Sequence, residues 1–138
     1  VPLDRAPEVM RALRDFWAAG GLEATGTFAT EIYPAPASPF TLSAASGGPR
    51  LRIDPFVFWR EDAKPELDYF KGYWELLKQH DARFHGGKSL SEPGSSTGAA
   101  YRRAECGATA WDAWKALRDV RDPDRIFVSH YWRAHLAL

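Results

Sequence analysis

The sequence predicts an α+β fold in which helices cover an antiparallel sheet and a helical C-terminal arm follows. Two segments rich in β-branched and aromatic residues, 25–33 and 50–60, have the composition of strands. Two segments with apolar residues at helical spacing, 4–20 and 62–80, flank them. With 138 residues and an apolar content of 45%, the chain is long enough to bury the core of one domain.

The first helix is expected to begin after a capping Asp4 and to end at the glycine pair Gly20-Gly21. Its apolar face consists of Val9, Met10, Leu13, Phe16 and Trp17. The strand at 25–33 then alternates, so that Ile32 lies on one face and Glu31 and Tyr33 lie on the other. Helix and strand together supply the first half of a sheet-and-helix layer.

Residues 34–49 are rich in proline and glycine and are expected to connect this strand to the next, Arg50–Arg60, in which Pro55 indicates a bulge or an edge position. A helix over Asp62–His80 follows, and residues 81–88 are expected to be short and extended. The order helix, strand, strand, helix, strand matches part of a ferredoxin-like split βαβ layer, in which two helices cover one sheet face.

The C-terminal third has a different composition. Residues 89–107 are rich in serine, glycine and alanine, which favours a long flexible loop. Thr109 and Asp112 have the spacing of a capping box and predict a helix that Asp122-Pro123 ends. We therefore divide the chain into a sheet-and-helix part at 1–88, a flexible loop at 89–107, and an arm at 108–138 that closes with a short helix.

Charge and cysteine content exclude several classes of function. Eighteen basic and eighteen acidic residues leave no net charge, so a nucleic acid or an anionic membrane surface is not an expected partner. Cys106 is the only cysteine, which excludes an internal disulfide and fits a reducing, cytoplasmic compartment. No apolar run is long enough to span a bilayer, and no histidine pair has the spacing of a metal site.

The string Arg83-Phe84-His85-Gly86-Gly87-Lys88 is the strongest candidate for a functional turn. Glycines let a backbone or a flat ligand come close, and a lysine beside them can place a positive charge against an electron-rich group. Taken alone, the string also fits a structural turn that ends in a solvated lysine.

Four motifs, in the same order, resemble the aldonolactone and alditol oxidase branch of the vanillyl-alcohol-oxidase flavoproteins. The turn is similar to the family's Arg-Pro-His-Trp-Gly-Lys, and the segment 117–133 is similar to its closing Leu-Asp-Pro and Phe-Leu-Asn-Pro-Tyr-Leu-Arg. Glu31-Ile32-Tyr33 resembles its Glu-Ile-Arg strand, and Leu42-Ser43 with Gly47-Gly48 resembles its Leu-Ser-Pro-x-Tyr-Gly-Arg connection. The resemblance extends over almost the whole chain.

This resemblance implies a cap over the substrate, residues 1–88, and an arm, residues 108–138, that packs on a flavin-binding domain. Hydride transfer from a CH–OH group of a sugar lactone, polyol or related alcohol to FAD would be the activity. Lys88 and Glu31 match the catalytic positions. The residues that match cofactor-binding positions are His85, Gly87, Ser129 and Tyr131.

Three departures from the family pattern bear on the chemistry: Tyr33 replaces an arginine, Gly86 a tryptophan and His130 a proline. The chain also lacks a glycine-rich pyrophosphate loop, so FAD would be bound mainly by a domain or subunit outside these residues. The expected partners are that flavin-binding domain and a small alcohol or sugar.

A second reading is a stand-alone ferredoxin-like module that binds a ligand or dimerises without catalysis. In that reading Glu31 is a solvated or salt-bridged carboxylate. Independently of either reading, His80 is expected to cap a helix C-terminus, His135 to be exposed, and Arg102 and Arg103 to face solvent.

Overall fold

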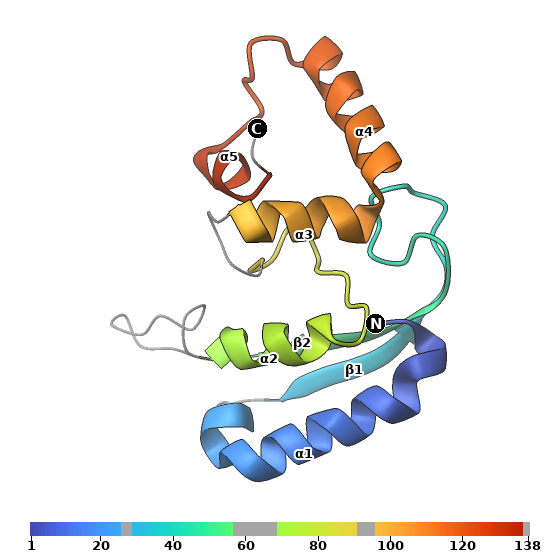
Figure 1. The fold of residues 1–138 in the computed structure, drawn as a ribbon, viewed down its shortest axis with the longest axis vertical. Coiled ribbons are helices and arrows are strands. Elements are labelled where there is room, and N and C mark those ends of the chain that lie inside the picture. Colours follow the sequence, from blue (N-terminus) through green and yellow to red (C-terminus); the bar gives the residue numbers. More distant parts are fainter. Residues whose placement is uncertain (26–28, 57–68, 91–95, 137–138) are drawn as a thin grey trace.

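The computed structural model describes residues 1–25, 29–56, 69–90 and 96–136 (Figure 1). The elements in these ranges are the short 3-10 helix η1 (Leu3–Arg5), α1 (Ala6–Thr25), β1 (Thr30–Ala35), β2 (Arg50–Pro55), α2 (Tyr69–Lys78), α3 (Ser96–Cys106), α4 (Ala108–Arg121) and α5 (His130–Leu136). Strands β1 and β2 pair antiparallel. The predicted α+β class, with helices beside an antiparallel sheet, is confirmed.

The core lies between the sheet and the two helices α1 and α2. Its buried members are Val1, Val9, Leu13, Leu51, Tyr73, Leu77 and Ala82. Ile32 and Ile53 are opposite each other in the strand register and pack against this cluster from the sheet. The indole nitrogen of Trp17 donates a hydrogen bond of 2.7 Å to the Tyr73 hydroxyl, which joins α1 to α2.

Gly72 allows the two helices to approach at this point. A Cβ on residue 72 would lie 2.9 Å from the ring of Phe16, closer than side chains can pack. The ring of Phe16 in turn meets that of Tyr73 edge to face, with centroids 5.1 Å apart. The predicted cover of one sheet face by two helices is therefore confirmed for the described residues.

Several predicted boundaries are wrong. Helix α1 continues through Gly20-Gly21 to Thr25, because glycine weakens a helix without being obliged to end it. Strand β1 begins at Thr30 and includes Pro34, which is tolerated because β1 is an edge strand of the sheet in the described part of the chain. The predicted residues at 26–28, 57–60 and 62–68 lie outside the described part of the chain.

The expected third strand at 81–88 is also wrong. Within the described ranges the sheet has only the strands β1 and β2, and residues 81–88 form an irregular segment with a turn. Side chains of α3 take the place of a neighbouring strand: Tyr101 donates to the carbonyl of Ala82, and Arg102 donates to the carbonyl of Phe84. These carbonyl groups, which would bond to a neighbouring strand in a sheet, are bonded to side chains of α3 instead.

The flexible loop predicted at 89–107 is wrong over residues 96–106, which form α3. The predicted capping box is wrong as well: Gly107, with φ of 84°, precedes α4, and no side chain caps that end. Asp112 instead pairs with Arg103 of α3. The predicted end of the helix is confirmed, since α4 ends at Arg121 and Asp122 is its C-cap. The buried Asp122 carboxylate accepts hydrogen bonds from the backbone N–H groups of Ile126 and Phe127, which stabilises the turn that follows.

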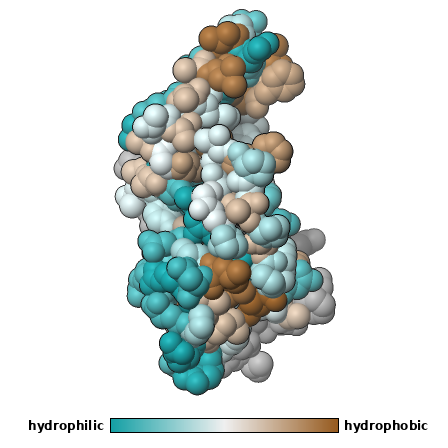
Figure 2. All heavy atoms as spheres, turned by 90° about the vertical axis from the view of Figure 1, so that its right-hand side faces the viewer, coloured by the Kyte–Doolittle hydropathy of each residue, from teal (hydrophilic) through white to brown (hydrophobic). Residues whose placement is uncertain are grey.

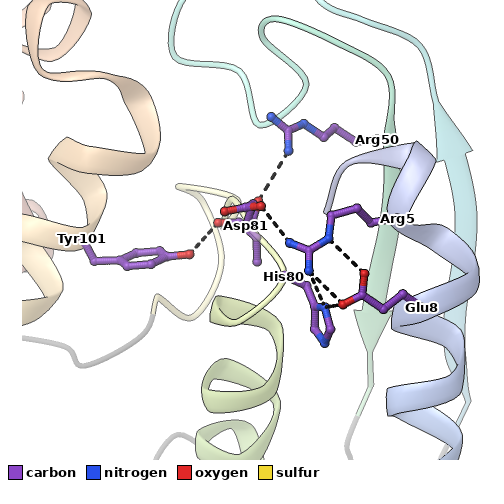
Figure 3. Close-up of polar contacts among 7 residues, drawn as sticks. Arg5, Glu8, Arg50, His80, Asp81 and Tyr101 are labelled. Carbon is purple, nitrogen blue, oxygen red and sulfur yellow. Dashed lines mark hydrogen bonds and ion pairs between the residues drawn. The ribbon is translucent and has the colours of Figure 1, made fainter.

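A polar network connects η1, α1 and β2 to the segment after α2, which Tyr101 in turn connects to α3 (Figure 3). Arg5 of η1 forms an ion pair of 2.7 Å with Asp81, and Arg50 of β2 donates to the Asp81 carbonyl. His80, expected to cap α2, instead lies buried with its Nδ1 3.0 Å from the carboxylate of Glu8 in α1. The network fixes residues 80–82, where the chain leaves α2 and crosses toward α3.

Candidate active site

The candidate site is built around the turn at residues 85–88, which follows this crossing. The Lys88 N–H donates to the His85 carbonyl at 3.0 Å, and the Gly87 N–H donates to Nδ1 of His85 at 3.0 Å. His85 therefore shapes the turn, while its ring remains exposed. Lys88 is exposed, and no carboxylate in the described part of the chain forms an ion pair with it within 4 Å.

Helix α5 closes over this turn from the C-terminal end of the chain. The Tyr131 hydroxyl donates to the Lys88 carbonyl, and the Trp132 ring packs on Gly86, where a Cβ would lie 3.3 Å from the ring. Ser129 stands before the helix, and its hydroxyl accepts a hydrogen bond of 3.3 Å from the Trp132 N–H, as an N-cap does. The turn and the tail, far apart in sequence, are thus adjacent.

Lys88 lines two cavities. One is a shallow hollow of about 480 Å³ formed by Gly86, Gly87, Lys88, Ser89, Tyr131 and Trp132. The other is a groove of about 280 Å³ between β2, α2 and residues 82–89. A charged side chain at this junction can act on a group bound on either side.

The groove has the composition of a site for a small polar molecule. Its apolar lining includes Leu51, Ile53, Tyr73, Trp74, Leu77 and Phe84, and its polar lining includes Arg52, Asp54, Arg83, His85 and Lys88. Ligand sites commonly combine an apolar wall with a few polar groups that set orientation. A polyol or sugar ring has both kinds of surface.

Glu31 is not brought beside Lys88. It lies on the exposed face of β1 and lines neither cavity, whereas Asp54, its partner in the strand register, lines the groove together with Lys88. Asp54 accepts a hydrogen bond of 3.1 Å from the Tyr33 hydroxyl and lies 3.8 Å from Arg52. Partial burial, with the adjacent Asp54, raises the pKa of the Tyr33 phenol, which keeps it a donor to that carboxylate.

Sequence reasoning missed Asp54 and Trp132. Alternation gave no signal for Asp54, since it places this residue on the same strand face as Arg52 and its register partner Glu31, opposite the apolar Leu51 and Ile53. Trp132 had none, because its contact with Gly86 joins residues that only the fold brings together. The tryptophan ring that the family motif carries in the turn is absent there, and a ring from α5 lies over the glycine instead.

Two expectations of exposed basic residues are wrong. Arg102 is buried, with an exposed fraction of 7%, because it bonds to the backbone of residue 84 and to Glu105. His135 is also buried, and its ring meets the ring of Tyr131 with centroids 3.9 Å apart. Arg103 is exposed, as expected.

Burial of His135 predicts a dependence of stability on pH. Desolvation, with the charge of Arg102 nearby, lowers the pKa of His135 below its usual 6.5. The unfolded chain then binds a proton that the folded chain resists, so stability is fully present above about pH 6.5 and falls as pH drops through the lowered value. Comparing urea melts at pH 8 and pH 5, we expect His135→Gln to lose less stability than the unchanged protein; an identical loss would contradict this account.

Other site chemistries have no support in the described residues. No group of three or more histidine, cysteine, aspartate or glutamate side chains there could hold a metal ion. Burial raises the pKa of the Cys106 thiol, which disfavours the thiolate that nucleophilic catalysis needs. Among the same residues, no helix combines the length and the apolar character needed to cross a bilayer.

An exposed lysine that lines two cavities, on a turn held by a second element, can place a positive charge against an electron-rich group. The family is given by a family model: the model described as D-arabinono-1,4-lactone oxidase matches residues 1–135. The chain therefore belongs to the D-arabinono-1,4-lactone oxidase family, and the resemblance inferred from the four motifs is confirmed. Comparison with curated proteins gave no match, and neither did comparison with solved structures.

Proposed function

We propose that this chain is the substrate-cap and C-terminal part of an FAD-dependent oxidoreductase that oxidises a CH–OH group of a sugar lactone, a polyol or a related alcohol. The family is generally FAD-dependent, which supports the cofactor. The single observation that carries the proposal is the position of Lys88 at the junction of the groove and the hollow. Substrate would occupy the groove, and the flavin ring would meet the hollow.

The residues of the hollow fit the edge of a planar, electron-rich ring. Gly86 and Gly87 line the hollow with backbone, and Tyr131 and Trp132 supply aromatic walls. Bound FAD would supply the acceptor for a hydride from the substrate carbon. Lys88 would place its positive charge against the ring or the substrate oxygen, and Tyr131 would hold the backbone of Lys88 through its carbonyl.

The roles predicted for other residues follow from their positions. His85 would act through the turn that its ring stabilises, and Ser129 would act by capping the helix that carries Tyr131. Gly87 would contribute its backbone to the hollow. Either Glu31 or Asp54 would orient the substrate hydroxyl, and the lining of the groove favours Asp54.

Asp54→Asn tests this choice of carboxylate. The amide keeps the size of the side chain and an acceptor for Tyr33 but loses the charge that binds and orients a hydroxyl. We expect flavin reduction to slow by about 100-fold, the lower range for a positioned acid–base group. Glu31→Gln is the matched comparison, and we expect its effect on the rate to be several times smaller. A larger effect of Glu31→Gln than of Asp54→Asn would assign the orientation of the substrate hydroxyl to Glu31.

FAD would be bound mainly by a flavin-binding domain or subunit outside these residues, and an exposed apolar surface supports contact with it. Leu117, Val120, Ile126 and Phe127 are 58%, 77%, 76% and 83% exposed. Figure 2 shows apolar side chains gathered at the end of the molecule formed by α4 and the turn after it. Large apolar patches on a surface mark sites of protein contact. The arm at 108–138 would thus pack on the flavin-binding domain.

The same surface is the reason to keep the second candidate, a ferredoxin-like module that binds a ligand or dimerises without catalysis. Co-expression with a flavin-binding domain of the same family separates the two. The proposal expects a yellow complex with a flavin absorbance that persists through size-exclusion chromatography. A colourless chain that elutes alone as a stable dimer would favour the module instead.

A further inference from the structure

The backbone of residues 82–90 is held by side chains rather than by a neighbouring strand. From α3, Tyr101 donates to the Ala82 carbonyl at 2.6 Å. Arg102 donates to the Phe84 carbonyl at 2.6 Å, and Glu105 accepts from the Phe84 N–H at 3.2 Å. Both backbone groups of Phe84 are therefore satisfied by one pair of side chains, a single residue before the turn that carries Lys88.

This pair is an ion pair removed from water. The side chains of Arg102 and Glu105 are 9% and 4% exposed, and they contact each other directly through Nη1 and Oε1. A buried ion pair is weak support for stability, since the loss of hydration offsets much of the attraction. Its directional bonds, however, fix the groups that it contacts.

The far end of the turn is held by α5. Tyr131 donates to the Lys88 carbonyl, and Trp132 packs on Gly86. A Cβ on residue 86 would also lie 3.5 Å from Nη2 of Arg102, so this arginine lies against the turn as well as before it. Phe84 is held before the turn and Lys88 at its end, so these contacts fix the orientation of the turn.

We propose that Arg102 and Glu105 are positioning residues: by gripping the backbone of Phe84, they aim the Lys88 side chain at the junction of the groove and the hollow. What the aimed lysine does rests on the proposed function. That the pair holds the backbone of Phe84 concerns this chain alone and does not depend on the proposed function. The competing account is that the pair only attaches α3 to the rest of the molecule.

The double variant Arg102→Met/Glu105→Leu removes the grip while leaving apolar side chains of similar size, a replacement that buried ion pairs often tolerate without loss of stability. Arg103→Met/Asp112→Leu is the matched control, since it removes the neighbouring exposed ion pair, whose hydrogen bonds join α3 to α4. Both are made in the full chain, together with its flavin-binding partner.

Residue-resolved amide hydrogen exchange measures the grip without any catalysis. In the first variant we expect the Phe84 and Lys88 amides to exchange at least about 10-fold faster, with α1 unchanged, because each opening of the turn becomes easier. The control should leave these amides unchanged. Unchanged exchange at both amides in the first variant would overturn the proposal. If that variant lowers the melting temperature, Glu105→Met gives the same test with a single change, since it removes the acceptor of the Phe84 N–H. Glu105→Gln, which keeps an acceptor there and loses only the charge, should leave exchange at Phe84 slow.

Flavin reduction separates positioning from attachment. We expect the first variant to lower the limiting rate by about 10-fold to 100-fold, the range produced by misplacing a catalytic group by about 1 Å. In a Lys88→Ala background it should have no further effect, because the group being aimed is gone. An equal fall in the rate in the unchanged and the Lys88→Ala backgrounds would show that the pair only attaches α3 to the rest of the molecule. If Lys88→Ala itself changes nothing, the proposed function fails, while the exchange measurement still decides whether the grip exists.

Discussion

Replacing Lys88 with alanine is expected to slow reduction of the flavin by about 100-fold to 1,000-fold, the range found when one preorganised donor to a developing charge is removed. Lys88 lines both the groove and the hollow, and it has no ion-pair partner among the described residues. Its charge is therefore available to the bound molecules. Stopped-flow measurement of flavin absorbance after mixing with substrate under anaerobic conditions measures this rate directly.

Two controls define the result. Lys88→Arg keeps the charge and should recover part of the rate, whereas Lys71→Ala removes an exposed lysine of α2 that pairs with Glu75 and should change nothing. Fold stability should be unaffected by Lys88→Ala, because the hydrogen bonds of this residue within the described part of the chain are made by its backbone. A full reduction rate in Lys88→Ala would remove the catalytic role from this residue.

The double variant Val120→Asp/Phe127→Asp is expected to weaken association with the flavin-binding domain by about 100-fold or more. Each side chain is more than three quarters exposed, and two new carboxylates in an apolar contact would be buried without partners. Losses of this size correspond to about 2.7 kcal/mol, which is ordinary for the central residues of an interface. Analytical ultracentrifugation or calorimetry of the two components measures the change.

The control for this experiment adds the same charge elsewhere. Ala18 and Ala19 are exposed on α1, and Ala18→Asp/Ala19→Asp should leave the affinity unchanged. The melting temperature of both variants should stay close to that of the unchanged chain, since none of the four residues belongs to the core. Equal affinities for the two double variants would place the contact on another surface.

Local pattern was enough to predict the elements that pack on the main core. The apolar stripe of α1 and the β-branched run of β1 carry their own periodicity, and both form near the expected positions. The start of α3 has no such stripe, because its serine, glycine and alanine residues do not distinguish a helix from a loop. The missing third strand depends on α3, since the side chains that bind residues 82–84 come from it.

The site was predictable only in part, for the same reason. The proximity of Lys88 to the segment that carries Tyr131 followed from the family resemblance, and the structure joins them by a hydrogen bond. Burial of Arg102 could not be read from a serine- and glycine-rich segment in which a charged side chain ordinarily faces water. The contact between Gly86 and Trp132 also depends on the fold, because neither residue has a local pattern that points to the other.

Anaerobic reduction of FAD on the flavin-binding domain by D-arabinono-1,4-lactone or a polyol, measured with and without this chain, tests whether the chain completes the active site. Rapid bleaching of the flavin is expected only when the chain is bound, and it should be lost in Lys88→Ala. A flavin-binding domain that is reduced at the same rate without the chain would show that the chain has no part in catalysis.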